Sequence, residues 1–93
     1  MHSVLDKAKE IVTERQVHYG TPLENHKTIA DVWTALLKAS KVIDGDVSIK
    51  PEEVALMMIA VKLCREFNAH KMDNLVDIAG YLLVAEECID CAL

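Results

Sequence analysis

Apolar side chains recur at intervals of three and four residues along most of the chain, a spacing typical of helices that bury one face. No run alternates between apolar and polar residues as a half-buried strand does. The first helix is predicted to begin after Ser3, whose hydroxyl can cap it, and to end at Gly20, which readily adopts a left-handed backbone. The pattern therefore indicates an all-α protein.

The sequence Thr21-Pro22-Leu23-Glu24 marks the clearest helix boundary. The threonine hydroxyl can accept an early backbone N–H, proline suits the first helical position, and the glutamate can reach back to the cap. This second helix is expected to run from residue 22 to about residue 40, before a loop at residues 42–50. Two further helices are expected, from residue 51 to about residue 68 and from about residue 73 to about residue 91.

The third predicted helix is apolar on nearly every side as far as Val61, so we expect it to be the central one. Trp33, on the second helix, is expected in the core. A chain of 93 residues suffices for one core, which predicts a single domain over residues 1–93. Four helices with short links favour an antiparallel up-down-up-down bundle, and 52% hydrophobic residues favour an oligomer that buries a further face.

The net charge of −5 belongs to the end of the chain. Residues 1–71 contain ten acidic and ten basic side chains, whereas residues 72–93 contain five acids and no lysine or arginine. Non-specific binding to nucleic acid or to an anionic membrane requires a basic face, so neither is expected. We expect the acids Glu86, Glu87 and Asp90 of the last helix to form a solvated face, although such an acidic helix could also meet a basic partner or a metal ion.

The three cysteines, Cys64, Cys88 and Cys91, are an odd number, and charged residues interrupt any apolar leader at the start of the chain. We therefore expect a reduced, cytoplasmic protein. Cys88 and Cys91 form a C-x-x-C with no second pair for zinc and no preceding strand for a redox fold, so plain thiols are expected. The longest apolar runs, residues 54–61 and 78–85, are far shorter than the roughly 20 residues of a membrane span.

Polar side chains cluster around two predicted helix corners, between the first two helices and between the last two. In an up-down-up-down bundle both corners lie at the same end, so their side chains should meet, beside a helix N-terminus that attracts anions. Lys62 interrupts an apolar run and needs a partner or an exit to water. The residues expected to contact a ligand are Arg15, Tyr19 and His26 from the first corner, Lys62, Arg65, His70, Asn74 and Tyr81 from the second, and Trp33.

Folding the third helix back on the fourth brings Arg65 close to Asp77, and the two are expected to pair. Asp73 then suits the N-cap of the last helix. Asp73 and Asp77, one turn apart, are also candidates to hold Mg²⁺ or Mn²⁺, while Lys62, Arg65 and His70 could bind phosphate oxygens. The structural and the ligand-binding roles are compatible.

Simpler roles compete for several of these positions. His18 and His26 suit helix ends or the surface, and Tyr81 suits the core with its hydroxyl at the edge. Gly80, inside the last helix, costs about 1 kcal/mol relative to alanine. We therefore expect it to allow the close approach of a neighbouring backbone or of a ligand.

One pattern of residues extends over nearly the full length of the chain. It consists of Arg15, Tyr19, Gly20, Pro22, Asn25, Trp33, Lys62, Arg65, His70, Asp73, Asn74, Asp77, Gly80 and Tyr81. In this pattern the chain resembles a family of small proteins found in bacteriophages and prophages. The resemblance implies a phage or prophage origin, and hence the cytoplasm of a bacterial host.

A more distant resemblance covers about a quarter of the chain. Residues 74–83, with Asn74, Asp77 and Tyr81, look like the last metal-binding helix of the MazG-type all-α nucleoside triphosphate pyrophosphohydrolases. Those enzymes hold magnesium with an E-x-x-E helix and an E-x-x-D helix. Here Asp77 matches the final carboxylate, Asn74 replaces a glutamate, and the E-x-x-E partner is missing. The resemblance implies a MazG-like scaffold with a degenerate metal site.

These observations lead to three functional hypotheses. The first is a protein that binds a nucleotide or a nucleotide phosphate, which would be a Mg²⁺- or Mn²⁺-dependent pyrophosphohydrolase if it is an enzyme. The second is a phage counter-defence protein without enzymatic activity. It would sequester a cyclic nucleotide or inhibit a host defence protein through its acidic last helix. The third is a structural oligomer in which the charged cluster is an interface.

Overall fold

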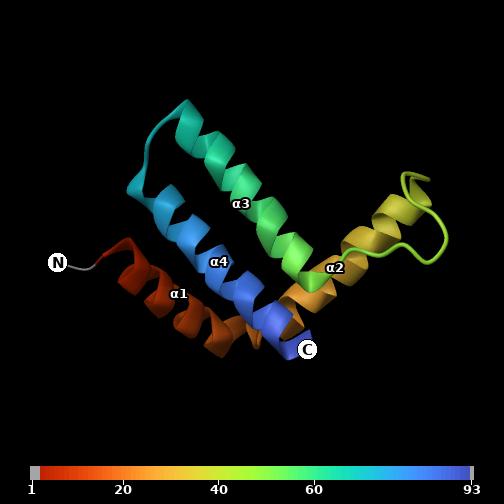
Figure 1. Ribbon diagram of the computed structural model, residues 1–93, viewed down its shortest axis with the longest axis horizontal. Coiled ribbons are helices and arrows are strands. Elements are labelled where there is room, and N and C mark those ends of the chain that lie inside the picture. The colour runs from red at the N-terminus through yellow and green to blue at the C-terminus, as the bar shows by residue number, and fades with distance from the viewer. Residues whose placement is uncertain (1–2, 93) are drawn as a thin grey trace.

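Four helices fill the segments between the predicted turns (Figure 1). The computed structural model describes residues 3–92, and these residues contain no strand. The all-α class and the number of helices predicted from the periodicity are therefore confirmed. The helices are α1 Val4–Tyr19, α2 Pro22–Ala39, α3 Pro51–Asn68 and α4 Met72–Ala92.

The predicted caps form where the sequence places them, with one difference. The Ser3 hydroxyl accepts the N–H of Asp6 at 3.1 Å, and the Thr21 hydroxyl accepts the N–H of Glu24 at 3.2 Å. Within the described residues, Glu24 does not return a bond to its cap, so only half of the expected capping box forms. The returning bond occurs instead at the start of α3, where the Glu53 carboxylate accepts the N–H of Lys50 at 2.8 Å.

The central helix is α4, because it contacts each of the other three. Within residues 3–92, α1 and α3 lie on opposite sides of α4 and do not touch (Figure 1). The expectation that the third helix is central is wrong, since the outer side of α3 is exposed at Leu56 and Phe67. Small buried residues on α4 are what allow three helices to approach it closely.

The core is made of small side chains. Among the described residues, the largest side chains with less than 2% of their surface exposed are those of Val54 and Cys88. The radius of gyration is 14.4 Å, compared with about 12 Å for a compact domain of this length. The difference arises because the second half of α2 and the loop after it project away from the other helices (Figure 1). The buried apolar residues are Ala8, Ala30, Val54, Ala55, Val76, Ala79, Val84, Ala85 and Cys88.

The direction of α1 differs from the predicted up-down-up-down order. Ala8 packs against Val76 and Ala79, and Val12 lies next to Gly80 one turn further along both helices. α1 and α4 therefore run parallel, whereas α3 and α4 run antiparallel as expected. The order fails because α2 barely contacts α1 and instead crosses α4 and α3.

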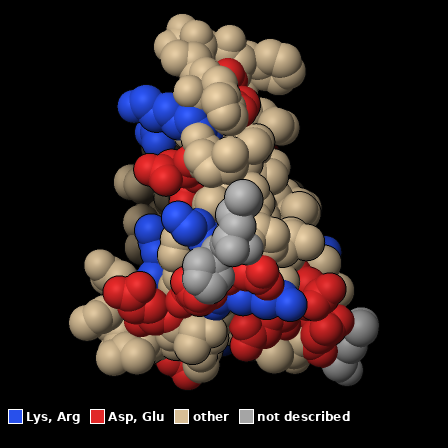
Figure 2. Space-filling view, turned by 90° about the vertical axis from the view of Figure 1, so that its left-hand side faces the viewer, with Lys and Arg blue, Asp and Glu red and all other residues tan. Residues whose placement is uncertain are grey.

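Charges of both signs are mixed on the face formed by α1 and the corner between α3 and α4. Figure 2 shows acidic and basic side chains next to one another on this face, with acids gathered toward its lower edge. The described residues of this face therefore form no continuous basic surface. No helix within residues 3–92 has both the length and the apolar character needed to cross a membrane.

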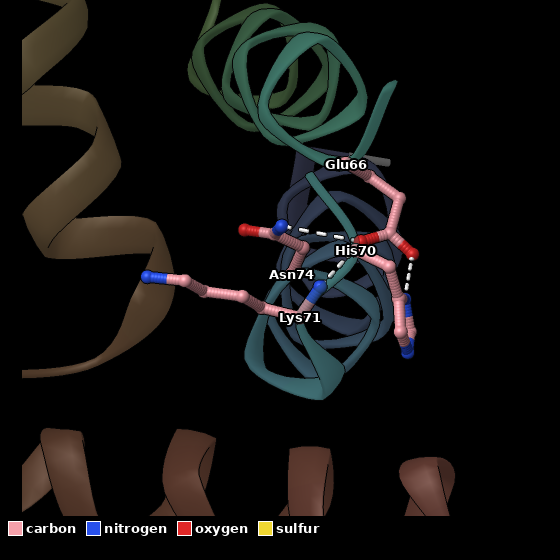
Figure 3. Close-up of polar contacts among 4 residues, drawn as sticks. All are labelled: Glu66, His70, Lys71 and Asn74. Atoms are coloured by element: carbon pink, nitrogen blue, oxygen red, sulfur yellow. Dashed lines mark hydrogen bonds and ion pairs between the residues drawn. The ribbon is translucent and has the colours of Figure 1, made fainter. Parts of the chain in front are cut away.

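The Glu66 carboxylate closes the corner between α3 and α4 (Figure 3). One oxygen accepts the N–H of Lys71 at 2.9 Å and the side-chain amide of Asn74 at 3.3 Å, and the other bonds Nδ1 of His70. Glu66 therefore takes the capping role that the sequence suggested for Asp73, which lies in the first turn of α4. The hydrogen bond from His70, followed by those from Lys71 and Asn74, lowers the pKa of Glu66.

Replacing Glu66 by alanine should lower the melting temperature, because the amide of the buried Asn74 and the N–H of Lys71 both lose their acceptor. Replacement by glutamine should have a smaller effect, since an amide oxygen still accepts. Because the pKa of Glu66 is lower in the folded state, the unfolded state takes up a proton at this carboxylate more readily. The stability that ionised Glu66 contributes is therefore complete above the ordinary glutamate pKa and is lost as the pH falls.

Thermal melts of the wild type, Glu66→Ala, Glu66→Gln and the exposed control Glu14→Ala, recorded at neutral and acidic pH, test this prediction. The difference between the wild type and Glu66→Ala should shrink in acid. An equal effect of Glu14→Ala at neutral pH would contradict the capping role.

Candidate functional site

A pocket of about 270 Å³ lies between α1, the first turns of α2 and the middle of α4, with one side chain contributed by α3. Its apolar lining includes Ala8, Val12 and Val76, which belong to the packing of α1 on α4. The pocket therefore exists because α1 runs parallel to α4 and turns into α2 beside the middle of that helix. Its polar side chains are Arg15, Gln16, Tyr19, Asn25, His26, Lys62, Asp77 and Tyr81.

Lys62 and Asp77 form an ion pair at the edge of the pocket. Nζ of Lys62 lies 2.9 Å from Oδ2 of Asp77, and the two side chains are 15% and 29% exposed. Asp77 is therefore paired with Lys62 and not with Arg65, which is exposed and has no ion pair within residues 3–92. The two side chains lie on different faces of α3. Residues 62 and 66 point toward α4, whereas residue 65 is rotated by roughly 100° from residue 66.

His26 is a buried neutral imidazole on the wall of the pocket. Its side chain is 6% exposed, and Nδ1 donates to the carbonyl of Pro22 at 3.1 Å. Burial, reinforced by the positive charge of Arg15 and only partly offset by the Pro22 bond, lowers the pKa of His26. Nε2 of His26 has no hydrogen-bond partner in residues 3–92, where every fully buried side-chain nitrogen or oxygen has one, so Nε2 is not fully buried. In the neutral ring, Nε2 is a hydrogen-bond acceptor, and His26 lines the pocket.

The ionisable side chains that line the pocket carry a net positive charge. Lys62 and Asp77 compensate each other, His26 is neutral, and Arg15 is exposed with no ion pair in the described part of the chain. The guanidinium of Arg15 presents several N–H donors in one plane, a geometry that suits carboxylate and phosphate oxygens. The arrangement therefore favours an anion beside Arg15.

Gly80 lines the pocket next to Tyr81. A methyl group at this position would come no closer than 3.7 Å to any side chain, its nearest neighbour being Val12. This is an ordinary contact, so the packing of α1 on α4 does not require a glycine. The sequence predicted that Gly80 allows the close approach of a neighbouring backbone or of a ligand. The geometry does not support the first role and is consistent with the second.

The pocket unites most of the two predicted clusters. Arg15, Tyr19 and His26 do meet Lys62, Asp77 and Tyr81, although through a different topology from the one expected. Four predicted ligand residues lie elsewhere. His70 and Asn74 belong to the Glu66 corner, Arg65 is exposed outside the pocket, and Trp33 lines a separate apolar groove with Leu36, Leu37, Ile49 and Met57.

Asn25 and Gln16 line the pocket and were not among the predicted contacts. Asn25 lies one turn after Thr21 and one residue before His26, so its place in the polar corner between α1 and α2 was a usable signal. Gln16 follows Arg15 directly, and nothing in its spacing distinguishes it from a solvated residue. Tyr81 lies edge-on to His26, with 6.3 Å between the ring centroids, and joins the two corners.

Within residues 3–92, no three histidine, cysteine, aspartate or glutamate side chains lie together in a way that could hold a metal ion. Asp73 is exposed and does not line the pocket, and Asp77 contacts the ammonium of Lys62. Metal binding by this pair stays a prediction. The cysteines are free, and burial, with Glu52 and Glu87 nearby, raises the pKa of Cys88 to about 11, so this residue is a thiol.

The buried His26 predicts a loss of stability in mild acid. The pKa of His26 is lower in the folded state than in the unfolded state, so protonation of this ring favours unfolding. The free energy of unfolding is therefore unaffected by His26 above the ordinary histidine pKa and falls as the pH drops below that pKa. The free energy of unfolding, measured by denaturant titration between about pH 8 and about pH 5, should therefore fall less for His26→Gln than for the wild type. Parallel curves for the two proteins would contradict this prediction.

Comparison with known proteins places the chain in a phage family, as its residue pattern predicted. A curated relative, the Gene 55 protein of Mycobacterium phage L5, is 40% identical over 87 residues, which cover 91% of this chain and 51% of the relative. The chain thus spans about half the length of that relative. No solved structure matches significantly, and the MazG resemblance stays a prediction. Residues 3–89 match the family described as Domain of unknown function (DUF6378), and the chain belongs to this family.

Proposed function

We propose that the protein binds a small anionic ligand, a nucleotide or a nucleotide-derived phosphate, in the pocket between α1, α2 and α4. The observation that carries the proposal is the Arg15 guanidinium, which lines the pocket without an ion-pair partner in residues 3–92 while the other full charges there are compensated. An anion beside Arg15 would gain charge-assisted hydrogen bonds without displacing an existing pair.

The other walls suit a ring attached to that anion. Tyr81 and Tyr19 supply aromatic surfaces, and Nε2 of the neutral His26 supplies an acceptor for an N–H or O–H group. The volume of about 270 Å³ is near the lower end for small-molecule pockets, which favours a mononucleotide-sized ligand over a larger one. Apolar residues at the base of the pocket exclude water from part of the ligand.

The side chains that line the pocket support ligand binding more than they support hydrolysis. Release of pyrophosphate in the manner of MazG-type enzymes requires carboxylates that hold Mg²⁺ or Mn²⁺ against a triphosphate. Asp77 is the only carboxylate among the described pocket-lining residues, and Lys62 neutralises it. We therefore infer a MazG-like ligand-binding role in which catalysis is secondary.

Two alternative functions concern phage counter-defence. Sequestration of a cyclic nucleotide, as a phage counter-defence, would use the same pocket and would release its ligand chemically intact after denaturation. Inhibition of a host defence protein would use the last turns of α4, where Glu86 and Asp90 are exposed. The phage relative is compatible with both, but only the first draws on the geometry of the pocket.

Arg15→Gln should weaken nucleotide binding by about tenfold, because an exposed charge-assisted hydrogen bond to phosphate is lost. The matched control is Lys9→Gln, which removes an exposed cation from the same helix away from the pocket. Calorimetric titration with nucleoside monophosphates, triphosphates and cyclic nucleotides, with and without Mg²⁺, measures the affinities. The absence of binding by every nucleotide, or an equal loss in both variants, would overturn the proposal.

Gly80→Ala should raise stability and weaken binding. The added methyl group favours the helix by up to about 1 kcal/mol and meets only an ordinary contact with Val12, but it occupies pocket space. Ala35→Gly is the matched control, since this exposed position on α2 should lose stability and keep its affinity. If Gly80→Ala binds as well as the wild type, the glycine does not serve a ligand.

A further inference from the structure

An unpartnered apolar stripe runs along the outer side of α3. Leu56, Ala60, Leu63 and Phe67 follow one another at intervals of four, three and four residues, the spacing of the contact seam between two packed helices. All four are exposed, and Phe67 is 89% exposed. The stripe faces away from α4, so no other helix in residues 3–92 covers it.

We propose that two copies of the chain pair through this stripe, with their α3 helices antiparallel around a two-fold axis. The stripe is symmetric about the midpoint between residues 61 and 62. An antiparallel pair centred there places Phe67 of each copy opposite Leu56 of the other, and Leu63 opposite Ala60. Large residues then face smaller ones, as a self-complementary two-fold interface requires.

A second apolar surface lies where the antiparallel pairing needs it. A groove lined only by Trp33, Leu36, Leu37, Ile49 and Met57 runs between α2 and the first half of α3, with a volume of about 340 Å³. Phe67 of the second copy would arrive beside Leu56 and Met57, at the edge of this groove. The pairing would cover two exposed apolar features that the single chain leaves open.

The charges at the two ends of α3 favour antiparallel over parallel pairing. The start of the helix carries Glu52 and Glu53. Its last turn carries Arg65 and Glu66, and the link after it carries His70 and Lys71. Glu66 pairs with His70, so Arg65 and Lys71 leave this end with a net positive charge. An antiparallel pair places the acidic end of one copy beside the basic end of the other. A parallel pair would place like charges together.

The exposed apolar area is large enough for a stable dimer. If roughly 200 Å², the area of a large aromatic side chain, is taken as an upper bound for each residue, the exposed fractions of Leu36, Leu56, Met57, Leu63 and Phe67 amount to at most roughly 600 Å². A standard interface buries about 800 Å² on each partner, of which somewhat more than half is apolar. Lys62 points toward α4, so both ligand pockets stay open in such a dimer.

The oligomeric state of the full chain tests the proposal. Analytical ultracentrifugation over an about hundredfold range of concentration should show a dimer, and Phe67→Asp and Ala60→Glu should each raise its dissociation constant at least about thirtyfold. The matched control is Leu5→Glu, at a 62% exposed position on α1, which should stay dimeric. Circular dichroism verifies that each variant keeps its helix content.

A monomeric wild type would overturn the proposal and would leave this face to another protein or to a further segment of a longer chain. Dimers that persist in both α3 variants, or that dissociate equally with Leu5→Glu, would also overturn it.

Cross-linking tests the orientation. In a background with Cys64→Ser and Cys91→Ser, Ala60→Cys protein is mixed with Leu63→Cys protein and treated with a short bifunctional thiol reagent. The buried Cys88 remains in place. Antiparallel pairing should give mainly the mixed product, whereas dominance of products that join two Ala60→Cys chains would overturn it.

Discussion

The close packing of three helices on α4 determines the rest of the structure. Three neighbours can approach one helix only if the side chains between them are small, and Ala8, Ala55, Ala79 and Ala85 meet that condition. This packing has a cost, because small side chains bury little apolar area each. The larger apolar residues of α2 and α3 consequently lie outside the core, where they form the groove and the stripe. The same packing leaves a pocket where α1 turns into α2.

Local features of the fold could be predicted from the sequence, because they depend on neighbouring residues. The caps at Ser3 and Thr21 and the four helix spans follow from side chains within one turn of each boundary. The direction of α1 relative to α4 could not be predicted, since it depends on the direction in which α2 leaves the two-residue turn that follows α1. Apolar content likewise indicated a central third helix, but side-chain size decided in favour of α4, whose buried alanines permit closer approach.

The candidate site was predictable in part for the same reason. Arg15, His26, Lys62 and Tyr81 were identified because polar residues were unusual in their apolar surroundings, and the structure brings them together. The expected pair of Asp77 with Arg65 was wrong. Counting residues along an antiparallel hairpin gives the height at which two residues meet, but it does not show on which face of the helix each side chain lies. Glu66 was missed because an exposed glutamate near a helix end is ordinary in sequence; only its three hydrogen-bond partners reveal its role.

The positions at which α2 and α3 begin offer an electrostatic explanation for the acidic residues at the end of the chain. Leu23 and Ala55, near the starts of α2 and α3, both belong to the cluster that contains Val84, Ala85 and Cys88 of α4, and Figure 1 shows the two helix starts close to the last turns of α4. Helix starts carry partial positive charge from aligned peptide dipoles. Two of them converge on the segment that contains Glu86 and Glu87. The negative charge of the last segment, together with Glu24, Glu52 and Glu53 in the first turns of the two helices, thus lies where the dipole field of the protein itself favours it.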